Sequence, residues 1–358
     1  MANRYRVAVV GVGHMHVLEN TGSFLNHPEF DVIGWADVQP DRQPICDKEH
    51  TRRGNLIQAE KWGQKVYADY RALLDEKPDI VLLCSENSKH AALGIEILSR
   101  GIHVVVEKPM ALDYAGAKAM ADEAQKQGVM LAVNWPSTWD PTIRAAQALA
   151  AEGAVGRIFK FVYRNSRSVG PLTYAAPVND DEKAAEWWHM ADQGGGAFYD
   201  YCCYGTNLAS YILGERAQSA WAMRANVNHP FASADDNGVI VGSFPSGAFA
   251  ILEGTWTTLA AGTPNGPLLF GLEGTLVADS ANREVRVYKE KGAVDPTYTR
   301  EAMFLPEDAD SLAKVIYRRL AMGEPLHPTM DMPVNLNAMA LLDAGLRACA
   351  SGKSEATL

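Results

Sequence analysis

Short apolar runs alternate with amphipathic segments along the first 135 residues of the chain. The apolar runs lie at 6–10, 30–37, 79–84, 101–106 and 129–133. Continuous apolar runs rich in β-branched residues are typical of parallel strands that helices cover on both faces. The amphipathic segments between them predict crossover helices, among them 91–99 and 114–127. This part of the sequence therefore predicts an α/β fold with a doubly wound parallel sheet.

The pattern changes after residue 135. Segments with strand character recur at 157–164, 217–226, 239–244, 248–257, 268–277 and 284–288. Most of the connections between them are too short for a crossover helix, which predicts antiparallel pairing. Helical patterns appear at 197–213, 309–322 and 336–350. We therefore expect two domains, an α/β domain at 1–135 and an α+β domain with a largely antiparallel sheet at 136–358.

Composition narrows the classes of function. The 358 residues include 33 basic and 43 acidic ones, a net charge of −10, and no Lys/Arg-rich tract, which argues against a nucleic-acid partner. No apolar run approaches the roughly 20 residues that cross a bilayer, and the N-terminus lacks a signal-peptide pattern, so we expect a cytoplasmic protein without a membrane partner. The cysteines lack metal-ligand spacing, so we expect reduced packing thiols and no metal site: Cys46, Cys84, Cys202, Cys203 and Cys349.

A glycine-rich turn, residues 11–16, joins the first strand to the first helix. Gly11 and Gly13 let the backbone turn tightly and let a pyrophosphate approach the N–H groups at the helix N-terminus. His14 lies in the turn, and His16 takes the place of the third glycine of the dinucleotide fingerprint. We expect all four residues to contact a nicotinamide dinucleotide, in a fold of the Rossmann type.

Asp37 ends the second strand and is placed to accept hydrogen bonds from a ribose diol. A carboxylate at this position repels a 2′-phosphate, which favours NAD over NADP. Arg42 follows five residues later and weakens the preference for NAD, because a nearby arginine can bind the 2′-phosphate of NADP. NAD is therefore the expected cofactor, with NADP as the alternative.

Polar residues follow two of the other parallel strands. Ser85, Asn87 and His90 come after the strand at 79–84, and Glu107 and Lys108 end the strand at 101–106. In an open α/β sheet, ligands bind outside the carboxyl ends of the strands. We expect these five residues to line the cofactor cleft, with Lys108 where cofactor and substrate meet. A solvated loop and a surface ion pair are the alternatives.

A triple glycine at residues 194–196 opens the second unusual stretch. Three glycines in a row are costly in backbone entropy, and are tolerated where the backbone approaches something closely. Asp200 and Tyr204 follow on one face of the next helix. The alternative is a capped helix with an aromatic core residue. We expect weaker substrate contacts from Trp188, His189 and Asn165.

Together these motifs resemble the glucose-fructose oxidoreductase / inositol dehydrogenase / rhizopine catabolism (Gfo/Idh/MocA) family. The similarity covers nearly the whole chain: Gly11-x-Gly13, Asp37, the 87–90 turn, Glu107-Lys108-Pro109, the 153–156 turn, the triple glycine with Asp200, and a final helix that runs into residues 351–353. The resemblance implies an N-terminal Rossmann domain and a C-terminal domain with a largely antiparallel sheet. The open face of that sheet often makes dimers or tetramers in the family, so a homo-oligomer is implied.

The resemblance also implies roles for three residues. In the family, the lysine after the glutamate acts on the substrate hydroxyl, which assigns Lys108. The family's Asp-x-x-x-His supplies a substrate contact and the catalytic base. Asp200 matches this motif, but Tyr204 takes the position of the histidine.

Oxidising a secondary alcohol removes a hydride and a proton, so a base must lie beside the hydroxyl. Lys108 can supply a hydrogen-bond donor or, once it is desolvated beside an oxidised nicotinamide, can have a lowered pKa. The ammonium should in turn lower the pKa of Tyr204, and the two should share the proton. Asp200 would hold a substrate hydroxyl, and His189 is the reserve base.

Three readings of function follow. The first is an NAD(P)-dependent sugar or polyol dehydrogenase, the substrate class that the resemblance implies. The second is an enzyme whose tightly held NAD is recycled during sugar cleavage or epimerisation. The third is a nucleotide-binding sensor that lost catalysis when its histidine became Tyr204.

Overall fold

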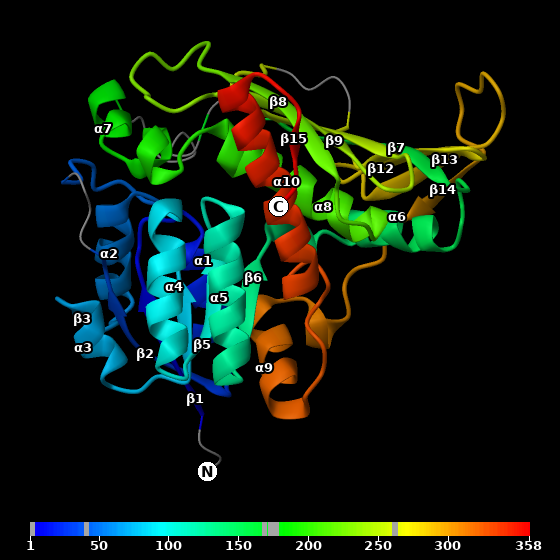
Figure 1. Cartoon of the computed structure of the whole chain (residues 1–358). Helices are drawn as coiled ribbons and strands as arrows, with labels where there is room; N and C mark the ends of the chain where they lie inside the picture. The colour runs from blue at the N-terminus through cyan, green and yellow to red at the C-terminus, as the bar shows by residue number, and fades with distance from the viewer. Residues whose placement is uncertain (1–3, 39–42, 167–169, 171–178, 260–263) are drawn as a thin grey trace.

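The computed structural model describes residues 4–38, 43–166, 170, 179–259 and 264–358. Within these ranges the chain forms two sheets, of six and of nine strands, which we call the N-terminal and the C-terminal sheet. Figure 1 shows them side by side, with α10 running between them. None of the helices in the described part of the chain combines the length and the apolar character needed to cross a bilayer.

The N-terminal sheet is parallel throughout and has the strand order β3-β2-β1-β4-β5-β6. Its strands are β1 (Tyr5–Val10), β2 (Phe30–Ala36), β3 (Val66–Tyr67), β4 (Ile80–Leu83), β5 (His103–Glu107) and β6 (Leu131–Asn134). The helices that connect them are α1 (Val17–Leu25), α2 (Arg52–Lys61), α3 (Tyr70–Leu74), α4 (His90–Ser99) and α5 (Tyr114–Gln127), and the turn η1 (Asn87–Lys89) precedes α4. The predicted doubly wound parallel sheet is confirmed.

The C-terminal sheet has the order β14-β13-β12-β11-β7-β10-β9-β8-β15. Its strands pair antiparallel except for β7 and β10 at its centre, which pair in parallel. The strands are β7 (Ile158–Ser166), β8 (Ser219–Ala225), β9 (Asn237–Ser243), β10 (Phe249–Thr255), β11 (Leu268–Gly271), β12 (Gly274–Asp279), β13 (Glu284–Tyr288), β14 (Tyr298–Glu301) and β15 (Glu355–Ala356). The predicted largely antiparallel sheet is confirmed.

One strand prediction is wrong. The segment 268–277 was expected to be a single strand, but it forms the hairpin of β11 and β12. Gly271 pairs with Gly274 across the turn, and a Cβ at Gly271 would lie 2.0 Å from the Val155 carbonyl oxygen. The two glycines bracket a two-residue turn, a hairpin signal that outweighs the apolar pattern running through it.

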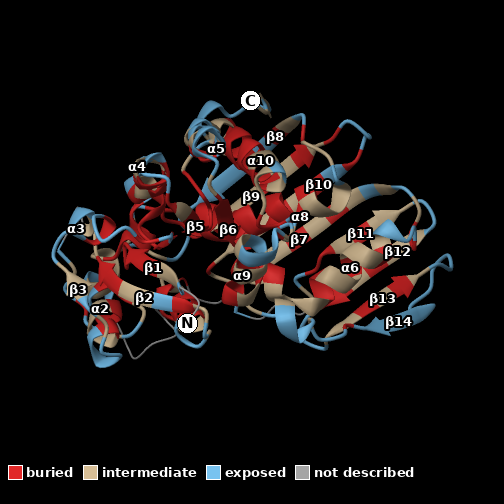
Figure 2. Cartoon of the chain, turned by 90° about the horizontal axis from the view of Figure 1, so that it is seen from below, coloured by how far each residue is buried: buried red, intermediate tan, exposed pale blue. Residues whose placement is uncertain are grey.

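Helices cover one face of the C-terminal sheet. They are α6 (Pro141–Ala151), α8 (Cys203–Leu213) and α10 (Met332–Ser351). The shorter elements are η2 (Pro136–Trp139), α7 (Asp180–Ala184), η3 (Trp187–His189), η4 (Ala191–Gln193), the π-turn η5 (Phe198–Cys202) and η6 (Glu307–Ala309). Buried residues, red in Figure 2, run from the N-terminal sheet into α8 and α10, so the two halves share one core.

The helix α9 (Leu312–Met322) returns to the N-terminal sheet (Figure 1). Leu312 and Ile316 pack in the same apolar cluster as Val17 and Phe24 of α1, and Ala313 N donates a hydrogen bond to Ser23 Oγ at 3.0 Å. The division at residue 135 therefore stays a proposal, and α9 adds a contribution from the C-terminal part to the N-terminal unit.

Candidate active site

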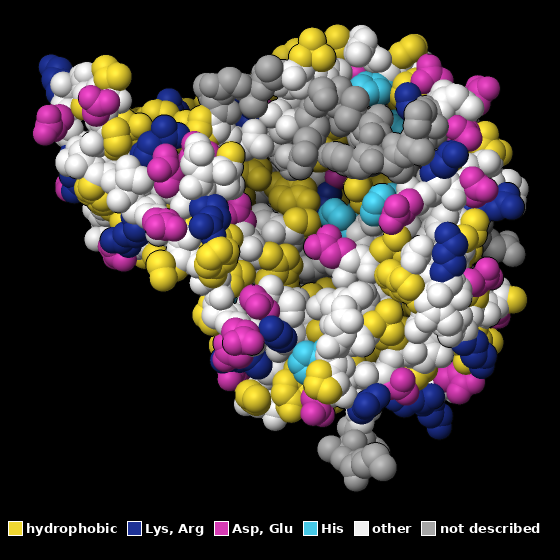
Figure 3. All heavy atoms as spheres, turned by 180° about the vertical axis from the view of Figure 1, so that it is seen from behind, with side chains coloured by type: hydrophobic (Ala, Val, Ile, Leu, Met, Phe, Trp, Pro, Cys, Tyr) yellow, Lys and Arg dark blue, Asp and Glu magenta, His cyan; other side chains and the backbone are white. Residues whose placement is uncertain are grey.

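The carboxyl ends of β1, β4 and β5 face a segment of the C-terminal half, residues 186–200. Asn87 Nδ2 donates to the Gly194 carbonyl at 2.8 Å, and Trp187 Nε1 donates to the Gly13 carbonyl at 2.7 Å. On this side the molecule is hollowed, with histidine and acidic side chains beside the hollow (Figure 3). The contacts bring the two predicted groups of site residues together, although about a hundred residues or more separate them in the sequence.

Close approaches on all sides explain the triple glycine. A Cβ at Gly194 would lie 2.3 Å from Leu112 Cδ2, one at Gly195 would lie 2.3 Å from the Trp188 carbonyl oxygen, and one at Gly196 would meet Asp235. Gly194 and Gly196 also have positive φ, which disfavours other residues. The loop therefore brings Asp200 to the N-terminal half by allowing a backbone path that larger residues would block.

Lys108 and Asp200 form a buried ion pair. Lys108 Nζ lies 2.5 Å from Asp200 Oδ1 and also donates to the Asp200 carbonyl at 3.0 Å. The two side chains are 2% and 7% exposed. Burial disfavours the ammonium, but the Asp200 carboxylate outweighs it, so the pKa of Lys108 is raised. The lowered pKa expected for Lys108 beside an oxidised nicotinamide stays a prediction, and the sequence did not show that the Asp200 carboxylate would lie against the amine.

Tyr204 lies on the other side of the ammonium. Lys108 Nζ is 4.7 Å from the centre of its ring, and the ring packs edge-on against Trp135. Burial, together with the charge of Asp200, raises the pKa of the phenol well above its usual value. The predicted meeting of Lys108 and Tyr204 is found, but the predicted lowering of the phenol pKa is contradicted. Tyr204 offers the ammonium its ring face, and the Asp200 carboxylate neutralises the charge that was expected to favour a phenolate.

The glycine-rich turn fits a dinucleotide. Gly11 has φ +75°, and a Cβ there would lie 2.6 Å from the backbone N of Ser85. No described residue accepts a hydrogen bond from the backbone N–H of Gly13 or Met15, so both remain open to phosphate oxygens at the start of α1. A pyrophosphate would be held by this turn, and Trp187 of η3 covers its edge.

Asp37 is held by Arg52, a contact that the sequence did not predict. Arg52 Nη1 contacts both Asp37 carboxylate oxygens, at 2.9 and 2.8 Å, and Arg52 Nη2 binds Glu86. Burial raises the pKa of Asp37 against the effect of Arg52. Arg42 lies outside the described residues. A buried arginine at the start of α2 was not recognised from the sequence, because α2 has little apolar periodicity.

Glu186 is a second group that sequence reasoning missed. It is buried beside Arg52, and burial raises its pKa to about 7. Nothing in the local pattern distinguishes it from the acidic residues that precede it at 180–182. It adds a titratable carboxyl close to Asp37.

Three of the predicted cofactor residues form a compact polar cluster. His16 Nδ1 lies 3.2 Å from Glu107 Oε2, and His14 Nε2 lies 3.6 Å from the same oxygen. His14 and Glu107 are fully buried. The sequence placed the three at one strand edge but did not show that they touch.

Ser85 and His90 brace the loops instead of facing open space. The His90 ring lies between the Pro109 carbonyl at 2.9 Å and the Ser85 carbonyl at 3.1 Å, and it is buried. Ser85 itself lies against Gly11. Both therefore position the turns that end β1, β4 and β5.

The three weaker substrate candidates have different surroundings. Trp188 stacks on Trp187 and meets the His14 ring edge-on. His189 has Nδ1 2.8 Å from the Lys183 carbonyl, and burial lowers its pKa to about 4. Asn165 lies on the strand face of Phe161 and Tyr163 of β7, which pack in the core with Tyr204.

Trp256 contacts both His189 and Asp200 and was not predicted. Its Nε1 donates to Asp200 Oδ2 at 3.3 Å, and its ring lies 5.8 Å from that of His189. It follows β10 directly and is fully buried. Both oxygens of Asp200 are thus engaged, one by Lys108 and one by Trp256.

Comparison with known proteins agrees with this geometry. Residues 5–135 match the model of an oxidoreductase family with an NAD-binding Rossmann fold, and residues 143–294 match the GFO/IDH/MocA C-terminal domain. D-glucoside 3-dehydrogenase of Escherichia coli is 27% identical over 211 residues, which are 58% of this chain and 54% of that protein. Myo-inositol 2-dehydrogenase of Thermotoga maritima is 26% identical over 276 residues, 74% of this chain and 77% of that protein.

Solved structures show the same fold over the whole length. The WlbA dehydrogenase from Bordetella pertussis, solved with NADH and UDP-GlcNAcA, aligns with a TM-score of 0.75 at 21% identity and covers 99% of both chains. This chain therefore combines an NAD-binding Rossmann fold, a GFO/IDH/MocA C-terminal domain and a lysine, Lys108, directly after β5. The chain belongs to the Gfo/Idh/MocA family of NAD-dependent oxidoreductases.

Proposed function

We propose that the protein transfers a hydride between NAD and a secondary hydroxyl of a sugar, a polyol or a sugar derivative. The observation that carries the proposal is the buried pair of Lys108 and Asp200, which joins the carboxyl end of β5 to the C-terminal half of the chain. Relatives named as inositol and glucoside dehydrogenases support the substrate class. Bound NAD would supply the hydride acceptor or donor.

Four side chains have distinct roles in the proposed reaction. Lys108 is the acid–base residue: as the ammonium it donates a proton to a carbonyl oxygen, and as the amine it accepts the proton of an alcohol. Asp200 holds Lys108 in place and sets its pKa, and Tyr204 packs against the ammonium. Asp37, which Arg52 holds in place, would accept hydrogen bonds from the hydroxyl groups of the adenosine ribose.

A panel of sugars, inositols and sugar acids, assayed with NAD and with NADP, tests the function. We expect reduced nicotinamide to accumulate with at least one polyol, and NAD to exceed NADP about 10- to 100-fold in kcat/KM, as one charge-assisted interaction allows. Substrate conversion without net NADH would favour the enzyme that recycles its NAD. Binding of NADH without any turnover across the panel would contradict the dehydrogenase and favour a sensor.

We also infer that the protein is a cytoplasmic homo-oligomer that pairs through the C-terminal sheet. The helices cover one face of this sheet, and the other face presents apolar side chains along its strands: Trp221, Met223, Val239, Val241, Phe249, Ile251, Leu268 and Phe270. An apolar face of this kind is typical of an interface between subunits. The five free cysteines suit a reducing compartment.

Trp221→Glu should disrupt this interface. A charge within an apolar contact would be buried without a partner, so we expect the variant to sediment as a monomer where the wild type does not. Analytical ultracentrifugation measures the change. Leu25→Glu, at an equally exposed apolar residue of α1, is the control and should keep the wild-type state. A monomeric wild type, or an unchanged Trp221 variant, would contradict the inference.

A further inference from the structure

Two histidines and a carboxylate converge at the start of α1. His14 Nε2 and His16 Nδ1 lie 3.6 and 3.2 Å from Glu107 Oε2, and all three atoms lie within 4.8 Å of one another. The two edges from the carboxylate oxygen to the rings are of the length found between ligand atoms around one metal ion bound at about 2.0–2.2 Å. Imidazole and carboxylate are ligands that suit zinc and its neighbours among the divalent transition metals.

The Glu107 carboxylate is oriented by hydrogen bonds, as the carboxylate ligands of metal ions usually are. Glu107 Oε1 accepts hydrogen bonds from the side-chain amides of Asn20 and Asn134, while Oε2 is the oxygen that faces the two rings. Supporting hydrogen bonds of this kind orient ligands and preset the site. One oxygen is therefore held in place, and the other is presented to the histidines.

His14 supplies an unpartnered polar atom. Its Nε2 is fully buried and has no hydrogen-bond partner among the described residues. His14 Nδ1 accepts a long hydrogen bond of 3.3 Å from the backbone N–H of His16, which leaves the proton of the neutral ring on Nε2. A metal ion at Nε2 takes the place of this proton, which moves to Nδ1 when the long hydrogen bond breaks.

The charges around Glu107 leave a negative balance. Glu107 is fully buried, and among the described residues its ion-pair contacts are to His14 and His16 alone. The ammonium of Lys108 is already neutralised by Asp200. A buried carboxylate without a full countercharge is costly, and a bound cation relieves that cost.

We propose that His14, His16 and Glu107 form a binding site for one divalent transition-metal ion such as Zn²⁺. The ligand atoms are His14 Nε2, His16 Nδ1 and Glu107 Oε2. Three protein ligands leave at least one position of the ion for water or a ligand. The proposal does not depend on the substrate class, since it rests on these three side chains alone.

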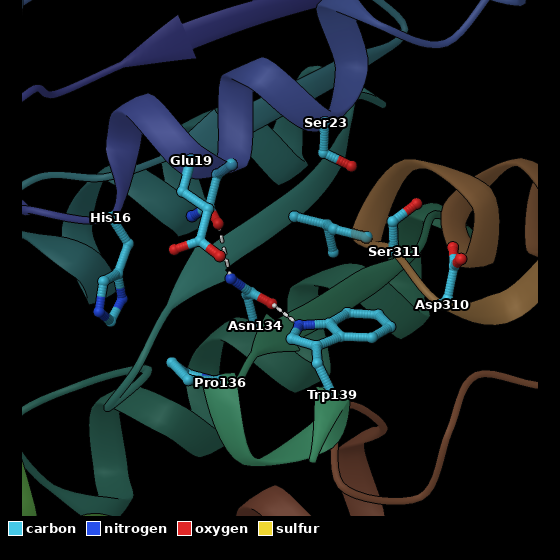
Figure 4. A pocket seen from close by; sticks show the side chains of 10 residues that line it. His16, Glu19, Ser23, Asn134, Pro136, Trp139, Asp310 and Ser311 are labelled. Atoms are coloured by element: carbon cyan, nitrogen blue, oxygen red, sulfur yellow. Dashed lines mark hydrogen bonds between the residues drawn. The ribbon is translucent and has the colours of Figure 1, made fainter. Parts of the chain in front are cut away.

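A pocket of about 160 Å³ gives the ion a way in. His16 lines it together with residues of α1, of η2 and of the start of α9. In Figure 4, His16 and Glu19 lie on the same side of the pocket. Asn134 is hydrogen-bonded to Asn20 and to Trp139. Of the three ligands, His16 alone is partly exposed, with 18% of its side chain open. An ion can therefore reach the cluster through this pocket without opening the fold.

Metal titration tests the proposal directly. Tag-free protein, stripped with a chelator and kept free of nicotinamide cofactor, is titrated with Zn²⁺ by calorimetry and with Co²⁺ by visible absorption. We expect one equivalent to bind, and His16→Gln to weaken Zn²⁺ binding by about 100-fold or more, since even supporting residues contribute 10- to 100-fold. X-ray absorption of the zinc-loaded protein should show nitrogen and oxygen neighbours and no sulfur.

His27→Gln is the matched control. His27 lies just past the other end of α1, packs against Phe30 and Tyr317, and should bind metal as the wild type does. Circular dichroism checks that His16→Gln is folded, and Glu107→Gln gives a second, independent loss of a ligand. Absence of Zn²⁺ binding by the wild type, equal binding by the His16 variant, or sulfur neighbours would overturn the site.

Discussion

Lys108→Met is expected to reduce kcat by about 10³- to 10⁴-fold, while NADH still binds. The methionine keeps the length and apolar stem of the side chain but removes the proton donor, and acid–base groups contribute about 10²- to 10⁴-fold to such steps. The substitution also leaves Asp200 buried with Trp256 Nε1 as its remaining side-chain donor. Loss of one partner of a buried pair destabilises a fold by about 3–5 kcal/mol, so the variant should unfold at a lower temperature. Turnover, NADH fluorescence and thermal unfolding are measured on one preparation.

The matched control for this variant is Lys118→Met. Lys118 and Asp122 on α5 also lie 2.5 Å apart, but their side chains are 49% and 56% exposed. An exposed pair contributes at most about 1 kcal/mol, so activity and stability should stay near those of the wild type. Lys108→Arg keeps a cation beside Asp200 and should restore stability without restoring the rate. Turnover retained in folded Lys108→Met would refute the acid–base assignment.

Asp200→Asn is expected to lower kcat for carbonyl reduction by about 100-fold at neutral pH and to change its pH profile. In the wild type, Asp200 holds the pKa of Lys108 above its usual value against the effect of burial. The amide keeps the burial but removes the charge, so the pKa of Lys108 must fall. The ammonium is then lost at lower pH, and the alkaline limb of the reduction profile should move toward acid. Alcohol oxidation, which needs the neutral amine, should be less impaired than reduction.

Asp122→Asn is the matched control for the carboxylate, since it removes the same charge from the exposed pair. It should leave both pH profiles unchanged. An alkaline limb that stays in place in Asp200→Asn would mean that Asp200 does not set the pKa of Lys108. The ion pair would then be structural, and a different residue would carry the proton.

Much of the fold followed from short-range patterns. Continuous apolar runs identified β1, β2, β4, β5 and β6, because strands buried on both faces cannot alternate with polar residues. The helix predicted at 114–127 is found as α5 and ends at Gly128, which has φ +66° as a left-handed C-cap. β3, with only two residues, was missed because two residues show no periodicity.

The site was harder to predict, because it depends on contacts between distant segments. The triple glycine indicated a close approach, but it did not reveal that the approach is to Trp188, Leu112 and Asp235. Trp187 and Gly13 are 174 residues apart in the sequence, and the residues around neither of them indicate that the two are in contact.

Tyr204 shows a different limit. The sequence placed the phenol beside the ammonium, and the structure does so too. The direction of its pKa depends on how far water is excluded and on which charge lies nearest, and burial and Asp200 both oppose ionisation. The pKa of Tyr204 is therefore set by tertiary packing, which cannot be read from a sequence motif.

The return of α9 to α1 limits how the two halves can move. The chain leaves the N-terminal half after β6, comes back at α9 and leaves again through α10, so three covalent connections join the two halves. A single linker would permit one half to rotate freely against the other, whereas three connections and a shared apolar core restrict such rotation. The contacts of Trp187 with Gly13 and of Asn87 with Gly194 are therefore made between two halves whose relative position the chain itself restrains.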